Sequence, residues 1–205
     1  MSQSYVIKRM QSPDFANAPV APIDKTVWID NYKPETTAQL IYDTTAEAFV
    51  ARLVCVESDP LARFTSFGDP VCRDSCMEWF CCFDTKDGRY VNFETNANGA
   101  LQSSLGFDRH GRIRINQFLS SEELPKIVIE KAADRWSATI TVKKSSLEKI
   151  YGHPLSFDNG TKLIGNFYKC GDETKTVHYI MWNPVGTEQP DYHRPEYFGE
   201  LLLQD

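Results

Sequence analysis

Two glutamates and an asparagine share one face of a predicted hairpin. Glu78, Asn92 and Glu94 occupy even positions of residues 77–83 and 90–95, while the odd positions from Met77 to Phe93 carry apolar residues. Because side chains alternate across a strand, the odd positions should face a core and the even positions should share the opposite face. Carboxylates and amides held on strands suit hydrogen bonding to the hydroxyls of a small polar ligand. The plainer alternative is a solvated outer face that binds nothing.

The same two glutamates allow a second chemistry. Glycosidases work with two carboxyl groups about 5 to 9 Å apart, and Glu78 and Glu94 could face the same way on neighbouring strands. Paired glutamates on a strand face are more often surface or binding groups, and the sequence shows no nucleophile with an adjacent base. Binding without catalysis is therefore the leading hypothesis, and glycoside hydrolysis is its alternative.

The cysteines form a dense but irregular group. They stand at positions 55, 72, 76, 81, 82 and 170. The four from Cys72 to Cys82 lack the paired C-x-x-C spacing of common zinc sites. Adjacent Cys81 and Cys82 on a strand would point to opposite faces and could not easily share one metal. Free thiols in a reducing compartment are expected, and the sequence identifies no metal ligands.

Short segments of alternating polarity must position these side chains. They cover residues 49–56, 77–83, 90–95, 112–118, 136–142, 162–169, 177–182 and 198–203. A period of two is typical of half-buried strands. One short helix is expected at residues 145–151, capped by Ser145 or Ser146 and ended by Gly152. The pattern predicts an all-β fold, an antiparallel β-sandwich of two sheets, immunoglobulin-like or jelly-roll-like, with one short helix.

Composition narrows the class of protein further. The 205 residues include 22 Lys and Arg against 28 Asp and Glu, a formal net charge of −6. That balance argues against a nucleic-acid partner, which needs a basic face, and no apolar run approaches the roughly 20 residues that span a membrane. Without repeats or linker-like segments, residues 1–205 are expected to form one domain. No signal peptide is seen, so a cytoplasmic location is expected, or secretion if a signal has been trimmed.

Four stretches of the sequence resemble a known family. They are DSCMEWF at 74–80, YVNFETN at 90–96, IGNFYKCG at 164–171, and WNP at 182–184 followed by DYHRPEYFGEL at 191–201. Their order and approximate spacing resemble the family 9 carbohydrate-binding modules, and most closely a stand-alone family 9-like branch. The resemblance covers most of the chain after about Val50. It implies a β-sandwich that binds a terminal mono- or disaccharide unit, serves carbohydrate catabolism and associates with glycoside hydrolases.

The resemblance also implies a set of ligand-binding residues, namely Glu78, Asn92, Lys169, Trp182, Gln189, Tyr192 and His193. In the family one sugar ring lies between two aromatic walls, and the second wall matches Tyr192. The first wall maps near Val71 or Cys72, which are not aromatic, although Phe64 or Phe67 could substitute if their loop folds over. Glu78 matches a strand glutamate that accepts hydrogen bonds from sugar hydroxyls.

The remaining matches are uneven. Asn92 stands where the family has an arginine, and Lys169 stands where it has a glutamine. Gln189 matches a polar residue ahead of the second wall, and His193 follows that wall directly. Trp182 matches a tryptophan that the family keeps near its site. The frame of the site is therefore present and its chemistry altered, so a changed ligand is expected as readily as a lost one.

Two cofactors enter through the resemblance alone. Some family members hold structural calcium, but its ligands cannot be mapped residue by residue. Related sandwiches bind haem through methionine and histidine, which makes Met77, Met181, His178 and His193 formal candidates that no spacing supports. Trp28, Trp79 and Trp136 are expected to pack in the core.

Overall fold

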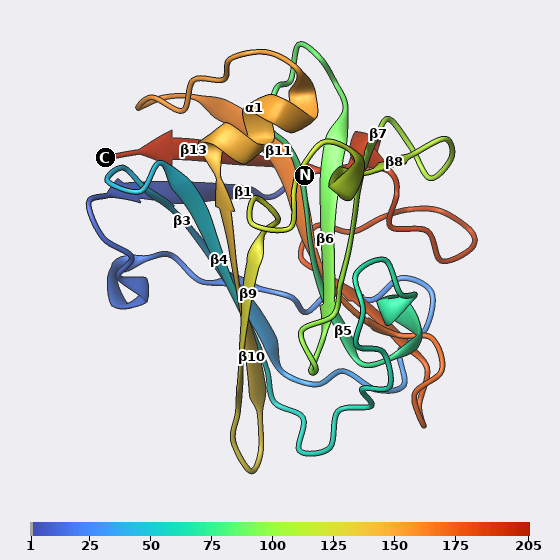
Figure 1. Ribbon diagram of the computed structural model, residues 1–205. Coiled ribbons are helices and arrows are strands. Elements are labelled where there is room, and N and C mark those ends of the chain that lie inside the picture. Colours follow the sequence, from blue (N-terminus) through green and yellow to red (C-terminus); the bar gives the residue numbers. More distant parts are fainter. Residues whose placement is uncertain (1) are drawn as a thin grey trace.

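The computed structural model describes residues 2–205 and consists mainly of strands (Figure 1). The strands are β1 (Ser4–Met10), β2 (Ala21–Pro22), β3 (Thr36–Asp43), β4 (Ala48–Cys55), β5 (Cys76–Cys82), β6 (Tyr90–Asn96), β7 (Leu101–Gly106), β8 (Ile113–Arg114), β9 (Lys126–Lys131), β10 (Trp136–Lys143), β11 (Lys162–Gly171), β12 (His178–Met181) and β13 (Gly199–Gln204). The α-helix is α1 (Lys144–Tyr151), and 3-10 turns lie at Phe15–Asn17, Val71–Arg73, Ile115–Gln117 and Pro195–Tyr197.

The strands form one curled sheet. Their order is β8-β7-β6-β5-β11-β13-β1-β3-β4-β10-β9, with β12 added to β11 and β2 to β3. Figure 1 shows β3, β4, β10 and β9 on one side of the molecule and β5, β6 and β11 on the other. This arrangement confirms the predicted all-β sandwich with one helix. Strand β1 runs parallel to both β13 and β3, whereas the other pairings are antiparallel, a detail that a period of two does not reveal.

The main core lies between the two sides of the curl. Trp79 and Phe93 stack at 4.8 Å on β5 and β6, and Phe49 from β4 reaches Trp79 with a ring separation of 6.3 Å. Trp136 and Ile140 of β10 belong to the same buried cluster. Aromatic pairs of this kind contribute about 0.5–1.5 kcal/mol beyond the area they bury. The core prediction for Trp79 and Trp136 is therefore confirmed.

Helix α1 follows β10 directly. It begins one residue before the predicted start, and its N-cap Lys143 makes no side-chain capping bond. The predicted serine caps are wrong, because Ser146 donates its hydroxyl hydrogen to Glu123 O at 2.8 Å instead. Gly152 ends the helix with φ of 81°, a left-handed conformation that favours glycine, as predicted.

The prediction for residues 112–118 is largely wrong. Only Ile113–Arg114 forms a strand, and Ile115–Gln117 is a 3-10 turn whose Ile115 is buried. The sequence pattern does not predict strand β3, because the second half of this strand is buried on both faces and lacks alternation. The structure of residues 2–205 contains no helix long and apolar enough to cross a membrane.

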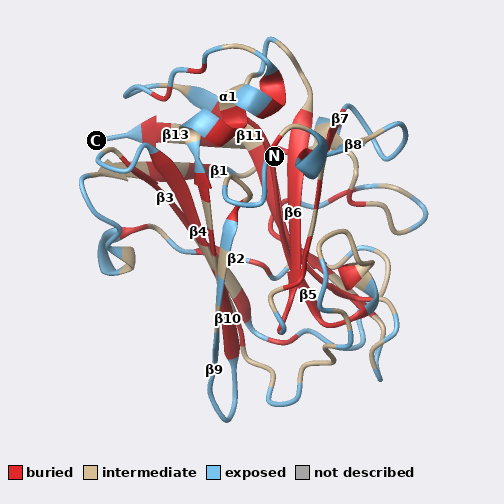
Figure 2. Ribbon diagram, in the orientation of Figure 1, coloured by how far each residue is buried: buried red, intermediate tan, exposed pale blue. Residues whose placement is uncertain are grey.

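The hairpin of β5 and β6 is buried on both faces, as its unbroken burial shows (Figure 2). Odd positions such as Met77 and Val91 enter the main core as predicted. The even positions are not a solvated face. They lie beneath a second cluster that includes Val71, Val185 and Phe198 from connecting segments.

Candidate binding pocket

A small pocket opens within this second cluster. Its volume is about 220 Å³, below the roughly 300–1,000 Å³ of sites for drug-sized molecules, so it suits one small ligand unit. The lining residues come from the outer face of the sheet and from four covering segments. They are Trp28, Cys72, Glu78, Glu94, Gln102, Arg109, Cys170, Asp172, Tyr179, Pro190, Asp191, Tyr192 and His193.

Two aromatic rings form one corner of the pocket. Tyr192 stacks on Tyr168 with a centroid distance of 3.9 Å and an interplanar angle of 12°. Its hydroxyl group donates toward the carbonyl oxygens of Lys169 and Ile180, at 3.1 Å each. This buried hydroxyl group therefore has hydrogen-bond partners within the protein. The ring of Trp28 lies 5.6 Å from that of Tyr192 and is tilted by 41°. Tyr192 is therefore held rigidly, with Trp28 as its neighbour.

The role of Trp28 differs from the sequence prediction of a core residue. It is half-buried, and its Nε1 donates to Thr187 O at 2.6 Å. An isolated bridge between Lys25 and Met181 brings this N-terminal segment beside β12. Thus the second pocket ring comes from a segment far from the expected positions near Val71 and Cys72. The residues around Trp28 in the sequence contain no pattern that predicts its contacts with such distant segments.

Two carboxyl groups lie deep in the pocket. Glu78 and Glu94 are register partners on β5 and β6, and they are 2 % and 3 % exposed. Burial, together with the charge of Glu94, raises the pKa of Glu78 well above its usual value. Burial also raises the pKa of Glu94 to about 7, although Asn92 donates to its Oε1 at 2.7 Å. This pair therefore retains a proton into the neutral range.

His193 adds a neutral imidazole to the same wall. Its Nδ1 lies 2.8 Å from the Tyr90 hydroxyl, and its Nε2 lies 3.9 Å from Glu94 Oε1. Burial and then the charges of Arg112 and Arg109 lower the pKa of His193 to about 3. A neutral ring has one donor and one acceptor nitrogen, which suits a ligand with hydroxyl groups.

The structure brings Glu78, Tyr192 and His193 to the pocket, with Asn92 directly behind Glu94. Asn92 is 1 % exposed, and its Oδ1 accepts from Ser104 N at 3.0 Å and Arg112 Nη2 at 2.6 Å. These two bonds hold the amide in place, so that its Nδ2 donates to Glu94. Gln189 is exposed and lines a neighbouring shallow hollow with Arg109 and Arg194.

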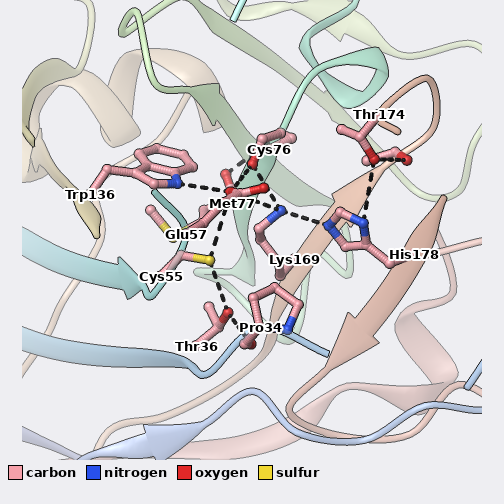
Figure 3. A network of polar contacts seen from close by, with 12 residues as sticks. Pro34, Thr36, Cys55, Glu57, Cys76, Met77, Trp136, Lys169, Thr174 and His178 are labelled. Carbon is pink, nitrogen blue, oxygen red and sulfur yellow. Dashed lines mark hydrogen bonds and ion pairs between the residues drawn. The ribbon is translucent and has the colours of Figure 1, made fainter. Parts of the chain in front are cut away.

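Lys169 does not join this pocket. It pairs in register with Met77, so its side chain enters the opposite face of the sheet from Glu78. There Nζ lies 2.9 Å from Ser75 Oγ, 2.7 Å from His178 Nε2 and 3.7 Å from Glu57 Oε2 (Figure 3). The resemblance of motifs does not reveal this, because a shift of one residue in register moves a side chain to the other face of the sheet.

Trp182 is also separated from the pocket. It is 2 % exposed and belongs to the main core, where its ring lies 5.7 Å from Phe167 and 6.4 Å from Tyr5. The backbone of Trp182 does lie beside the IGNFYKCG segment of β11, because Trp182 N donates to Phe167 O at 2.9 Å.

The formal haem candidates are not gathered around one cavity. Met77 lies in the main core and Met181 in the second cluster, where its sulfur accepts from Val185 N at 3.0 Å. His178 is committed to Lys169, and only His193 lines the pocket. Within residues 2–205, then, the four do not form a haem site.

The cysteines are all free thiols. The one group in residues 2–205 with three potential metal-ligating side chains in reach of one another is Cys76, Glu78 and Cys170. Calcium takes six to eight oxygen ligands, so a set with two thiols does not fit it.

A larger hollow of about 640 Å³ lies near Tyr32 and Glu57. It is lined mainly by a connecting segment, residues 58–62, and by the turn at residues 173–176. Tyr32 is its one aromatic residue. The smaller pocket combines several aromatic rings with buried polar groups, and this combination better fits specific recognition.

The fold and the pocket define a β-sandwich domain in which aromatic rings and carboxyl groups line one small pocket. The family model described as Carbohydrate-binding family 9 matches residues 9–203, and the chain belongs to that family. This confirms the resemblance found in the motifs. No curated protein matches the chain.

Three solved structures share the fold. A candidate carbohydrate-binding protein from Bacteroides uniformis ATCC 8492 is 24 % identical over 100 % of both chains, with a TM-score of 0.83. A family 9 module from Caldicellulosiruptor kristjanssonii in complex with glucose is 10 % identical over 98 % of this chain and 96 % of its own, with a TM-score of 0.67. A module from the same organism in complex with cellotriose is 13 % identical over 98 % and 94 %, with a TM-score of 0.66.

Proposed function

We propose that the protein binds carbohydrate without cleaving it, and that the pocket beside Trp28 and Tyr192 receives one terminal sugar unit. The observation that carries this proposal is the meeting of two aromatic rings with Glu78, Glu94 and His193 in about 220 Å³. A pyranose has an apolar C–H face and a polar edge. The rings suit the first, and the carboxyl and imidazole groups suit the second.

The choice of sugar rests on the relatives. Two family 9 structures hold glucose and cellotriose, so the first ligands to examine are glucose and short β-glucans. The pocket is small, so we expect dissociation constants nearer millimolar than micromolar, or about −4 to −6 kcal/mol. In this proposal the protein serves carbohydrate catabolism by recognising sugar ends beside glycoside hydrolases that cleave them.

Hydrolysis by the protein itself is the competing function, because Glu78 and Glu94 share the pocket. The two side chains project together from neighbouring strands. Glycosidase carboxyl groups instead flank the scissile bond. Side-by-side placement on one wall supports binding over cleavage.

Isothermal titration calorimetry with a panel of mono- and disaccharides tests the proposal. The best ligand should bind at one site, and Tyr192→Ala and Glu94→Gln should each weaken it by about one to two decades. Tyr32→Ala removes a ring from the other hollow and is the matched control. The proposal is wrong if no sugar binds, or if both pocket variants bind like the parent. Multiple turnover of a glycoside, lost in Glu78→Gln, would establish the hydrolase instead.

A further inference from the structure

Three potential metal ligands meet at the inner end of the pocket. Cys76 Sγ, Cys170 Sγ and a carboxylate oxygen of Glu78 all lie within 4.8 Å of one another. We propose that these three side chains form a zinc site, with two thiolates and one carboxylate as ligands and a fourth position open to the pocket. The metal site does not depend on the sugar proposal.

The backbone places the ligands with little freedom. Cys76 and Cys170 are register partners on β5 and β11, and Glu78 follows Cys76 by two residues on the same face. In a tetrahedral site with Zn–S near 2.3 Å and Zn–O near 2.1 Å, neighbouring ligand atoms are about 3.5–3.8 Å apart. Cys170 Sγ is already 3.0 Å from Glu78 Oε1. Small rotamer adjustments would therefore admit the ion.

The surroundings of Glu78 are a second, independent observation. This carboxyl group is 2 % exposed, yet in residues 2–205 it receives no hydrogen bond from an N–H or hydroxyl donor and forms no ion pair. Asp74 shows the usual pattern for a buried carboxylate, because it accepts from Arg63 Nε at 2.9 Å and from Arg63 N at 2.7 Å. A buried carboxyl group whose neighbours are thiols keeps its proton unless a positive charge offsets the cost of ionising it, and a divalent cation would supply that charge.

The donor set identifies the metal. Thiolates select soft or borderline ions, whereas calcium and magnesium prefer oxygen, so two thiolates with one carboxylate favour Zn²⁺. Glu78 and Cys170 line the pocket, so the fourth position faces it and would hold water or an oxygen of a bound molecule. Three protein ligands with one open position are typical of zinc sites that contact substrate. Coordination would release to solvent the two thiol protons together with the proton that Glu78 holds, because all three ligands bind the ion in deprotonated form.

The sequence could not predict this cluster. Cys72, Cys76, Cys81 and Cys82 are the cysteines that lie close together in the sequence, and their spacing is not that of common zinc sites. In the structure Cys81 faces the main core, and the Cys82 thiol donates a hydrogen bond to Asp84 O at 3.1 Å. The second thiol comes instead from Cys170, 94 residues away along the chain but directly opposite Cys76 across the sheet.

Metal titration of the full chain tests the site. Protein purified under reducing conditions and stripped with a chelator is titrated with Zn²⁺ against a chromophoric competitor, and separately with Co²⁺. We expect one Zn²⁺ per chain, and for Co²⁺ the thiolate charge-transfer and visible bands of a tetrahedral thiolate complex. Cys76→Ser, Cys170→Ser and Glu78→Gln should each weaken Zn²⁺ binding at least about tenfold.

Cys82→Ser is the matched control, because Cys82 is a buried thiol on the same strand and the same face as Cys76. It should leave zinc affinity unchanged. A direct readout that needs no variant is alkylation, since Zn²⁺ should protect two thiols of the parent protein that mass spectrometry identifies as Cys76 and Cys170. The proposal is overturned if zinc does not bind stoichiometrically, if Co²⁺ gives no thiolate bands, or if the three ligand variants bind zinc like Cys82→Ser.

Discussion

The ammonium group of Lys169 lies 2.7 Å from Nε2 of His178, and both side chains are buried. Nδ1 of His178 lies 2.8 Å from Thr176 O, so this nitrogen donates to the carbonyl and Nε2 accepts from lysine. Lys169 also lies 3.7 Å from Glu57, whose Oε2 accepts from Trp136 Nε1 at 3.1 Å (Figure 3). The pair therefore links β11 and β12 to the end of β4 and to β10, across the two sides of the sheet.

Replacing Lys169 should destabilise the fold. Lys169→Met leaves Glu57 without its nearby cation, and breaking a buried ion pair by removing one partner costs about 3–5 kcal/mol. Urea unfolding measures the loss. Lys162→Met is the control, because Lys162 pairs with Glu200 at the surface and such pairs contribute about 1 kcal/mol or less. An equal effect of the two substitutions would contradict a structural role for Lys169.

His178 should make stability depend on pH in the acid range. Burial, and then the charge of Lys169, lower the pKa of His178 to about 4 from 6.5. Between these values the unfolded chain binds a proton that the folded chain does not, so stability falls as pH falls from 6.5 towards 4. The full contribution is on the order of 1–3 kcal/mol.

The comparison needed is between the parent and His178→Gln. Glutamine can accept from Lys169 and donate to Thr176 but does not titrate. Urea unfolding at pH 7 and pH 4.5 should therefore show a smaller loss for the variant than for the parent. His193, whose pKa is lowered to about 3, acts in the same direction in both proteins and cancels in the difference. Equal losses would show that His178 does not carry the effect.

Alternation in the sequence identified several strands of the main core, because Trp79, Phe93 and Ile140 lie in segments with a period of two, but it did not identify β3, whose Leu40 belongs to the same core. It also placed Glu78 and Glu94 on one face. The face assigned to Lys169 depends on which residue it opposes across the sheet, and a pattern within one strand contains no such information. Lys169 pairs with Met77 and not with Glu78, so its side chain lies on the face of the sheet opposite the pocket.

The aromatic ring contributed by Trp28 shows a second limit. Its segment contains little regular structure, and its position is fixed by contacts with residues more than 150 positions away, such as the bond to Thr187 O. Local propensity contains no trace of such contacts. Motif matching placed the missing wall near Cys72, which does line the pocket but provides a thiol in place of a ring.

Removing the Trp28 ring should weaken sugar binding more than it changes stability. Trp28 is half-buried at the pocket, so Trp28→Ala removes an aromatic contact that typically contributes on the order of 1–3 kcal/mol, or about one to two decades in affinity. Calorimetric titration of the best sugar measures the effect. Val27→Ala, at the exposed neighbouring position, should leave affinity unchanged. If Trp28→Ala binds like Val27→Ala, the pocket is bounded by Tyr192 alone.

Close packing of Gly199 on Trp182 gives a test of whether that tryptophan belongs to the core or to the site. A Cβ at position 199 would lie 2.4 Å from Cζ3 of Trp182 and 2.9 Å from Gln3 O. Gly199→Ala should therefore lower the free energy of unfolding by about 1–3 kcal/mol. Gly186→Ala is the control, because its new Cβ would meet nothing closer than Tyr197 at 3.4 Å.

A second substitution separates this clash from a general loss of backbone freedom. In the Gly199→Ala background, Trp182→Phe makes the clashing ring smaller and should restore part of the lost stability, which urea unfolding of the four proteins in the cycle would show as a favourable coupling. Sugar affinity should change little in Gly199→Ala, because Trp182 does not line the pocket. If Gly199→Ala instead lost much of its sugar affinity while its stability was unchanged, Trp182 would have to be part of the binding site.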